Sequence, residues 1–161
     1  MKSIERYKLE GHPFVVFVMC GIPGSGKSTW VQENHNDLPF VSRDVVRTKL
    51  GYTAEGEKAV LTNGQEAEVT REEYFQMAKL GMKKKSFCVD DTNGSKYRKE
   101  LLTALRSYNA YIIGVNMDTP LEVCINRRRG QIPAFKMEQI ALKHRPLRED
   151  EVDELITVKG Y

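Results

Sequence analysis

Unbroken apolar runs alternate along the chain with segments in which apolar residues recur roughly every three or four positions. The run at 13–20, PFVVFVMC, contains no charged residue, which predicts a strand buried on both faces, as the strands of parallel sheets are. Shorter apolar runs predict further strands at 39–42, 85–91 and 110–118.

Helices are predicted between and after these strands, at 27–35, 44–50, 71–85, 94–108 and 119–130. Thr70 and Glu73 have the spacing of a capping box that opens the third helix, and Thr119, Pro120 and Glu122 open the last. Because strands and helices alternate, we expect one α/β domain over residues 1–161. It should have a parallel sheet of about four to five strands, helices on both faces and right-handed crossovers.

The stretch at 51–69 has weak periodicity and many small or polar residues. A long connection of this kind inside a compact domain is usually functional or mobile. We therefore expect 51–69 to be an insertion on the substrate side of the domain.

Composition adds few constraints. The 161 residues carry a net charge of +3, which permits contact with nucleic acid but does not argue for it, because strong electrostatic binders are usually far more basic. No apolar run approaches the roughly 20 residues of a membrane span, and 1–13 lacks the apolar stretch of a signal peptide. Cys20 and Cys88 lie in strand-like runs, where buried free thiols are typical, so a cytoplasmic location is expected.

A glycine-rich turn follows the first predicted strand. Residues 21–28, GIPGSGKS, match G-x-x-x-x-G-K-[ST] between a buried strand and a helix, the context that phosphate binding requires. Backbone N–H groups of such a turn point at phosphate oxygens, and the helix adds its positive dipole end. Lys27 is expected to reach the β- and γ-phosphates, and Ser28 to hold Mg²⁺. The expected contacts with ATP are Gly21, Pro23, Gly24, Ser25, Gly26, Lys27, Ser28 and Thr29.

Other P-loop classes fit less well than a small kinase. Residues 91–94 match the D-x-x-G switch of a GTPase, but no N-K-x-D base reader is present. An AAA-like or helicase motor is usually longer, and its acidic strand ends in Asp-Glu, whereas this strand ends in Asp90-Asp91-Thr92. The remaining class is a compact P-loop kinase core, which adds an acid on the acceptor side and a small arginine-bearing lid.

The acceptor-side candidate is SRDVVRTKL at 42–50. Asp44 and Arg47 lie three residues apart, so they share a face if this segment is helical. A kinase needs an acid to accept the proton of the attacking hydroxyl and a cation to hold a nearby phosphate. The alternative is that Asp44 only caps the helix and that Arg47 is a surface charge.

The lid candidate is NRRRGQIP at 126–133, within a lid expected over 126–136. An arginine is well suited to stabilise charge on a transferring phosphoryl group, although a basic surface run is the alternative. A third candidate is the acidic strand end, where Asp91 is expected to help order Mg²⁺. Asp91, Thr92 and Asn93 are equally compatible with the start of a helix.

Together these blocks resemble the kinase domain of phage-type 5′-hydroxyl polynucleotide kinases. The resemblance rests on GIPGSGKSTW, SRDVVR, DDTN and RRRG, and it runs from about Phe14 to about Arg148. It implies transfer of the γ-phosphate of ATP to the 5′-hydroxyl ends of DNA or RNA. Relatives are often fused to a 3′-phosphatase, and no D-x-D-x-T phosphatase signature is present here.

By position, the resemblance implies that Lys27 and Ser28 contact phosphate and Mg²⁺, and that Asp44 is the general base. It implies that Arg47 grips the acceptor's phosphate backbone, with Arg43 as a basic position beside it.

Asp91 and Thr92 match the family's strand end, with Asp91 as the metal ligand and Thr92 on the substrate side. Arg129 matches the lid arginine. Two alternatives stay open, namely a kinase of a nucleoside, sugar acid or nucleotide sugar, and a nucleotide-binding module without catalysis.

Overall fold

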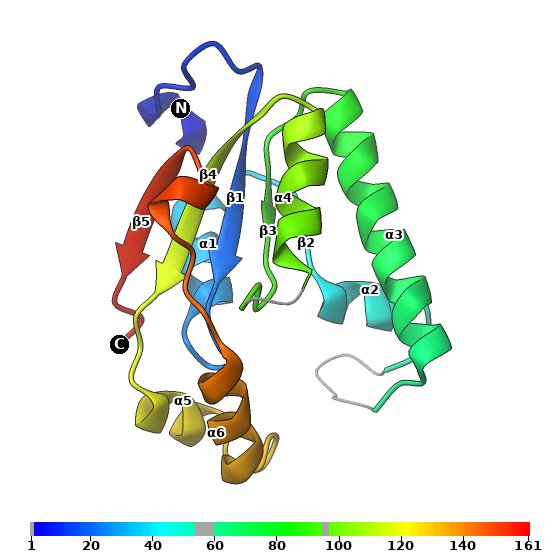
Figure 1. Ribbon diagram of the computed structural model, residues 1–161, viewed down its shortest axis with the longest axis vertical. Coiled ribbons are helices and arrows are strands. Elements are labelled where there is room, and N and C mark those ends of the chain that lie inside the picture. Colours follow the sequence, from blue (N-terminus) through cyan, green and yellow to red (C-terminus); the bar gives the residue numbers. More distant parts are fainter. Residues whose placement is uncertain (1, 54–59, 95–96) are drawn as a thin grey trace.

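The computed structural model describes residues 2–53, 60–94 and 97–161 and has the expected α/β architecture (Figure 1). Five strands form one parallel sheet in the order β2-β3-β1-β4-β5. Their bounds are β1 Phe14–Cys20, β2 Phe40–Val41, β3 Phe87–Val89, β4 Ala110–Met117 and β5 Glu154–Val158. The predicted sheet of about four to five parallel strands is therefore confirmed.

Strand β1 lies at the centre of the sheet and is buried along its whole length. Its alternate side chains enter two separate cores, with Phe14, Val16 and Val18 on one face and Val15 and Phe17 on the other. A strand covered on both faces has no side that needs polar residues, which explains its continuous apolar run.

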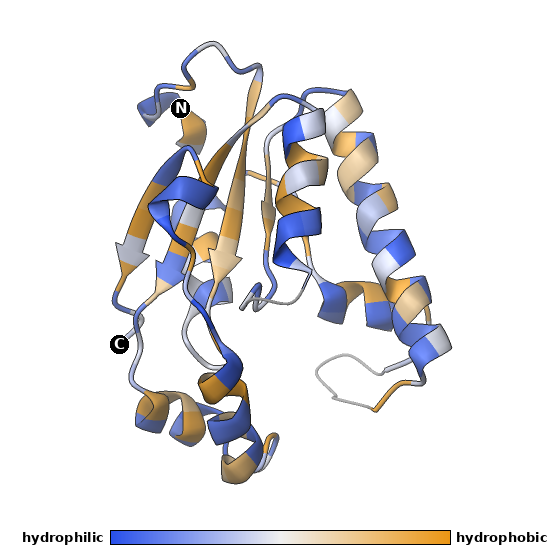
Figure 2. Ribbon diagram, viewed as in Figure 1, coloured by the Kyte–Doolittle hydropathy of each residue, from blue (hydrophilic) through white to orange (hydrophobic). Residues whose placement is uncertain are grey.

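Helices cover both faces of the sheet, and Figure 2 colours the central strand β1 as hydrophobic along its length. Helix α1 (Lys27–His35) and the 3₁₀ turn η1 (Ser3–Arg6) pack on one face, and α3 (Asn63–Met82) and α4 (Arg98–Ser107) pack on the other. Helices α2 (Arg43–Lys49), α5 (Leu121–Arg127) and α6 (Ala134–Lys143) lie toward the carboxyl ends of the strands (Figure 1). A second 3₁₀ turn, η2, spans Glu149–Glu151. No described helix is both long and apolar enough to span a membrane.

Helix α3 begins earlier than the predicted 71–85, and the expected capping box of Thr70 and Glu73 is wrong. The helix starts at Asn63, where Thr62 accepts a hydrogen bond from the Gln65 backbone N–H and the Gln65 side chain accepts one from the Thr62 N–H. This box satisfies two donors of the helix start, so the helix begins there and Thr70 lies in its interior. Residues 63–69 of the expected insertion are consequently helical, while its residues 54–59 lie outside the described residues.

Helix α6 and strand β5 occupy segments for which no element is predicted from the sequence. Pro133 precedes α6, a position that suits its fixed φ, and Met137 and Ile140 recur at helical spacing. Together α5 and α6 form a helical pair around a small apolar core that includes Cys124 and Met137. Ile22 of the glycine-rich turn belongs to the same core, so the pair packs directly on that turn.

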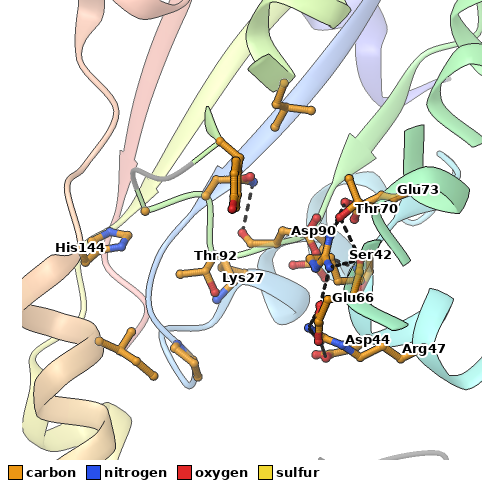
Figure 3. Close-up of a pocket in the computed structure, with 18 of the residues that line it drawn as sticks. Lys27, Ser42, Asp44, Arg47, Glu66, Thr70, Glu73, Asp90, Thr92 and His144 are labelled. Carbon is orange, nitrogen blue, oxygen red and sulfur yellow. Dashed lines mark hydrogen bonds and ion pairs between the residues drawn. The ribbon is translucent and has the colours of Figure 1, made fainter. Parts of the chain in front are cut away.

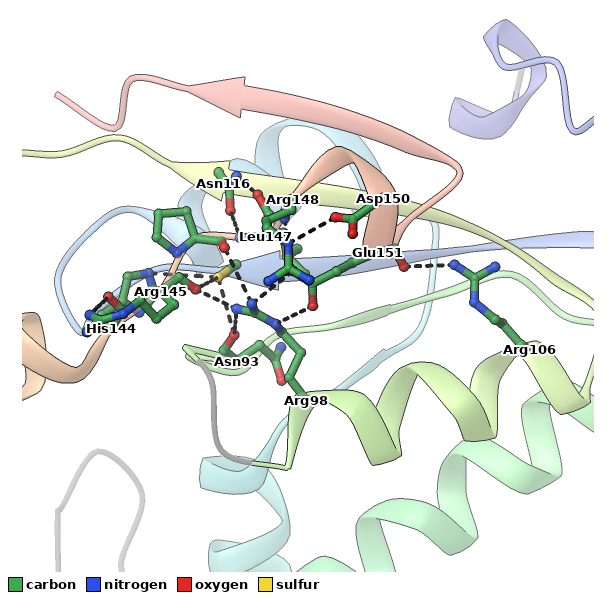
Figure 4. A network of polar contacts seen from close by, with 12 residues as sticks. Asn93, Arg98, Arg106, Asn116, His144, Arg145, Leu147, Arg148, Asp150 and Glu151 are labelled. Atoms are coloured by element: carbon green, nitrogen blue, oxygen red, sulfur yellow. Dashed lines mark hydrogen bonds and ion pairs between the residues drawn. The ribbon is translucent and has the colours of Figure 1, made fainter.

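A buried arginine ties the end of β3 to the chain that follows α6 (Figure 4). Arg98 is 5% exposed and pairs with Glu151 through Nε at 3.0 Å and Nη2 at 2.9 Å. Its Nη1 donates to the carbonyl oxygens of Asn93 and Arg145. Asn93 is therefore held between the core and the segment that leaves the lid.

Replacing Arg98 by methionine should lower the free energy of unfolding by about 3–5 kcal/mol, because Glu151 would stay largely buried without its partner. Urea denaturation followed by circular dichroism measures the change. Arg148→Met is the matched control, since Arg148 reaches the same carboxylate at 3.8 Å from an exposed position. Equal losses in the two variants would contradict a special role for the buried pair.

Candidate active site

The glycine-rich turn closes over the carboxyl end of β1. Gly24 and Gly26 adopt φ of +82° and +99°, conformations that side chains disfavour. A Cβ at Gly24 would lie 2.9 Å from the Cys124 carbonyl oxygen, so the turn also needs glycine where it passes α5. The Gly21 N–H donates to the Thr92 carbonyl at 3.0 Å, which joins the turn to the end of β3.

Lys27 and Ser28 stand at the start of α1 with defined partners. Lys27 Nζ donates to the carbonyl oxygens of Gly21 and Ile22 at 2.9 and 3.0 Å. Ser28 Oγ donates to Asp90 Oδ2 at 2.8 Å. Because the first N–H groups of α1 have no partner within the helix, this corner can receive phosphate oxygens.

The two acids at the end of β3 have different partners. Asp90 accepts the hydrogen bond from Ser28. Burial raises the pKa of Asp90, while the Ser28 hydrogen bond and the Lys27 charge act to lower it. Asp91 instead accepts the Arg43 N–H at 2.8 Å and so satisfies a donor at the start of α2. The carboxylate beside Ser28 is therefore that of Asp90, whereas Asp91 is the acid that the sequence predicts to help order Mg²⁺.

These residues fit a Mg²⁺ ion that is bound mainly through a nucleotide. Among the described residues, no three His, Cys, Asp or Glu side chains are grouped to hold a metal by themselves. Mg²⁺ usually keeps several waters and takes one or two protein oxygens together with substrate phosphates. Ser28 and Asp90 supply such a pair beside Lys27, with Asp91 next to them.

Two cavities meet at the glycine-rich turn, with volumes of about 1170 Å³ and about 520 Å³. Lys27, Ser28 and Arg128 line both of them. In the larger cavity, Lys27 and Thr92 lie between His144 on the lid side and a polar cluster on α2 and α3 (Figure 3). The smaller cavity extends from the turn toward Trp30 and Tyr161.

The polar cluster contains the predicted acceptor-side pair. Arg47 Nη1 donates to Asp44 Oδ1 at 2.9 Å, so the two side chains share a face of α2 as the spacing predicts. Asp44 is not the N-cap, because that position belongs to Ser42. The Asp44 side chain is 67% exposed and lines the larger cavity, as Arg43 also does.

A second acid from α3 lies deep in this cluster. Glu73 is 5% exposed, and its Oε2 has no hydrogen-bond partner among the described residues. Burial, followed by the adjacent Asp91 carboxylate, raises the pKa of Glu73 well above its ordinary value, which Arg43 and Arg47 oppose only in part. Glu73 is therefore protonated near neutral pH.

The lid brings one arginine to both cavities, and it is Arg128. Its Nη1 donates to Gln131 at 3.1 Å, while its Nε is buried without a partner among the described residues. Arg129, the expected lid arginine, is exposed and donates to Asn126 Oδ1 at 2.7 Å, and it is absent from the described lining of either cavity. Arg127 binds the Gly24 carbonyl at 2.9 Å.

The structure thus brings most of the predicted site residues together. The larger cavity is lined by Pro23, Lys27, Ser28, Arg43, Asp44, Arg47, Asp91 and Thr92, and the smaller by Gly24, Gly26, Lys27, Ser28 and Thr29. Gly21 and Ser25 shape the turn from beneath without lining either cavity among the described residues. Further residues line the larger cavity without being predicted as site residues, among them Glu66, Thr70, Glu73 and Arg128. The sequence predicts Thr70 and Glu73 only as a capping box, and Arg128 only as part of the lid segment. The helical spacing of 63, 66, 70 and 73 is the signal that could have identified the α3 residues.

The chain resembles known families in sequence and in fold. The model of the AAA_33 family, described as an AAA domain, matches residues 16–143. By this match the chain is an AAA domain, although its sequence motifs alone fit a small kinase better than an AAA-like motor. The residues after β3 are Asp90-Asp91, and not the Asp-Glu pair expected of such a motor. No curated protein sequence matches the chain.

Solved structures of kinases share the fold at low sequence identity. A protein from Chloroflexus aurantiacus named as a kinase has a TM-score of 0.69 at 15% identity, covering 90% of this chain and 87% of its own. A chain of the Pnkp1/Rnl/Hen1 RNA repair complex has a TM-score of 0.67 at 19% identity, covering 86% of this chain and 45% of its own. Shikimate kinase from Aquifex aeolicus has a TM-score of 0.54 at 20% identity, covering 91% and 86%. These likenesses establish a P-loop kinase fold.

The buried Glu73 makes a pH-dependent contribution to stability. Its folded pKa is raised, so the unfolded chain releases this proton at a lower pH than the folded chain does. Between about pH 5 and about pH 9, the free energy of unfolding of the wild type should therefore fall relative to Glu73→Gln, by up to about 1.4 kcal/mol per pH unit.

Urea denaturation at several pH values measures this difference. Glu72→Gln is the control, because Glu72 is paired with Lys49 on the same helix and its pKa is lowered. Parallel curves for the wild type and Glu73→Gln would show that Glu73 is ionised in the folded protein.

Proposed function

The chain belongs to the AAA_33 family of AAA domains, and from that premise we propose that it transfers the γ-phosphate of ATP to the 5′-hydroxyl end of a polynucleotide. One observation carries the proposal. The larger cavity joins Lys27 and Ser28 on one side to the Asp44–Arg47 pair on the other (Figure 3). A phosphate-binding turn that shares a cavity with a carboxylate and an arginine has the parts of a phosphotransferase.

The acceptor end supplies the base and the anchor. Asp44 takes the proton of the 5′-hydroxyl while the hydroxyl oxygen attacks the γ-phosphorus of ATP. The bond between the γ-phosphorus and the bridging oxygen that leaves with ADP breaks in line with this attack. Arg47, with Arg43 beside it, holds the phosphate group adjacent to that hydroxyl. Thr92 lines the path between the two ends of the cavity.

The donor end supplies the positive charge. Backbone N–H groups of 21–29 and the Lys27 ammonium hold the β- and γ-phosphates. A Mg²⁺ ion held through Ser28, Asp90 and its neighbour Asp91 would neutralise charge on the phosphate oxygens. The cavity of about 520 Å³ beyond the turn is large enough for the nucleoside of ATP.

We assign to Arg128 the role that the family resemblance gives to Arg129. Arg128 lines both cavities, so its guanidinium can reach a phosphoryl group that moves between them. Its buried Nε lacks a partner among the described residues, and phosphate oxygens would satisfy this donor.

The sequence blocks SRDVVR, DDTN and RRRG favour a polynucleotide acceptor through their resemblance to polynucleotide kinases. The cavity of about 1170 Å³ spans both the phosphate corner at Lys27 and Ser28 and the acceptor end. A small-molecule kinase is the second candidate, because shikimate kinase shares the fold and because acidic residues balance the arginines of the acceptor end. The two candidates differ in the acceptor and share the donor site.

Offering ATP labelled at the γ-phosphate to several acceptors tests the proposal. We expect oligonucleotides with 5′-hydroxyl ends to be labelled far faster than free nucleosides, and sugar acids to stay unlabelled. Label on a small molecule alone would overturn the assignment of the acceptor.

In the same assay, Asp44→Asn should lower kcat at least about 100-fold, because the amide cannot accept the proton. Its affinity for ATP, measured by calorimetry, should stay close to the wild-type value. Glu138→Gln, an exposed carboxylate change on α6, is the control. Wild-type turnover by Asp44→Asn would remove Asp44 from the mechanism.

The two lid arginines can be separated by alanine substitutions. Arg128→Ala should lower kcat at least about 100-fold, since an arginine on the transferring phosphoryl group is worth that much or more. Arg129→Ala should keep kcat within about threefold, because its guanidinium pairs with Asn126. Steady-state kinetics with the labelled acceptor gives both values, and the reverse ranking would return the role to Arg129.

A further inference from the structure

The two arginines of the acceptor end already hold an anion, which is a side chain of the protein itself. The Glu66 carboxylate lies between them, with Arg43 Nη2 at 2.5 Å and Arg47 Nη2 at 3.1 and 3.2 Å from its oxygens (Figure 3). Carboxylate and phosphate groups present oxygens to arginine in the same way. Glu66 thus stands where the phosphate group of an acceptor would bind.

The charges of this group cancel. Arg43 and Arg47 face the carboxylates of Asp44 and Glu66 in one connected set of ion pairs. Burial alone would raise the pKa of Glu66, but the hydrogen bonds and charges of the two arginines outweigh it and lower the pKa. Glu66 is therefore ionised, and an anionic acceptor meets no uncompensated positive charge at this end of the cavity.

Arg47 is only partly satisfied by this arrangement. Both Glu66 oxygens contact its Nη2, and its Nη1 donates to Asp44. Its Nε is buried and has no partner among the described residues. A buried donor without a partner costs about 1–3 kcal/mol, so a tetrahedral anion that reached Nε as well as Nη2 would be bound better than the carboxylate is.

Glu66 can leave without collapse of the arginine cluster. Its side chain is 37% exposed and belongs to the first turn of α3, where a carboxylate is favoured by the helix dipole. Arg43 remains anchored, because its Nη1 donates to Thr70 Oγ1 and its Nη2 to the Glu66 backbone carbonyl. A binding site for phosphate is therefore preformed behind the Glu66 carboxylate.

We infer that Glu66 is a specificity-determining residue that occupies the acceptor-phosphate site of Arg43 and Arg47 and must be displaced by a phosphate group of the acceptor. This inference rests on the proposed function, since it concerns the same acceptor site. Displacement costs free energy, so a single phosphate binds weakly, and an acceptor with further backbone contacts is favoured. Loss of the Glu66 charge should relax that selection.

The test compares two acceptors that differ only in one phosphate group, thymidine and thymidine 3′-monophosphate. Glu66→Gln should raise the ratio of kcat/KM for the 3′-monophosphate over thymidine at least about tenfold, which corresponds to about 1.4 kcal/mol. The KM for ATP should not change. A decrease of kcat/KM by the same factor for both acceptors would overturn the inference, because Glu66 would then only hold the arginines in place.

Glu72→Gln is the matched control. Glu72 also joins α3 to α2, through Lys49 at 2.5 Å, but it is absent from the described lining of the cavity. This variant should leave the acceptor ratio unchanged. If Glu66→Gln does not fold, Glu66→Asp takes its place. The shorter side chain keeps the charge but reaches the arginines less well, and an unchanged ratio in that variant would overturn the inference.

A binding measurement separates this inference from the proposed function. Thymidine 3′-monophosphate is titrated into each protein by calorimetry while a non-hydrolysable ATP analogue saturates the donor site. Binding to Glu66→Gln at least about fivefold tighter than to the wild type supports the inference even if no oligonucleotide is phosphorylated, in which case only the proposed function fails. Equal affinities would overturn the inference even if oligonucleotides are phosphorylated.

Discussion

The parallel pairing of β1 with β3 is the constraint on which the site depends. It sets Val18 beside Val89, so both chains leave the sheet at the same edge. The glycine-rich turn then meets the acidic end of β3, and the Gly21–Thr92 hydrogen bond and the Ser28–Asp90 contact follow from that proximity. Ligands of open α/β sheets bind at this edge because the loops there leave a crevice.

Two flanking elements complete the cavity, and each is attached to the core in its own way. The α5–α6 pair shares an apolar core with Ile22, so the lid packs on the turn that it covers. Helix α3 is joined to α2 by ion pairs, in which Arg43 and Arg47 of α2 meet Glu66 of α3. The α5–α6 pair is thus held by apolar burial, which is not directional, and helices α2 and α3 are joined by directional charge pairs.

Asp90 and Asp91, the two acids that follow β3, have different partners although they are adjacent in sequence. Asp90 contacts Ser28 at the glycine-rich turn. Asp91 accepts a hydrogen bond from the start of α2, and its charge contributes to the raised pKa of Glu73. The two residues follow β3, whose last residue is Val89, and contact different elements, so neighbours in sequence serve different parts of the site. Arg128 and Arg129 are separated in a similar way in the turn that follows α5, where Arg128 donates to Gln131 and Arg129 donates to Asn126.

The sequence by itself determined the fold class, the phosphate-binding turn and the Asp44–Arg47 pair, because these follow from local periodicity and from spacing within one element. Only the tertiary structure decided that Asp90 meets Ser28, that Arg128 lines both cavities and that Glu66 and Glu73 reach the acceptor end. These last facts depend on how separate elements pack against one another. Spacing along the chain predicts which residues lie on the same face of a helix or strand. It does not predict which other element packs against that face.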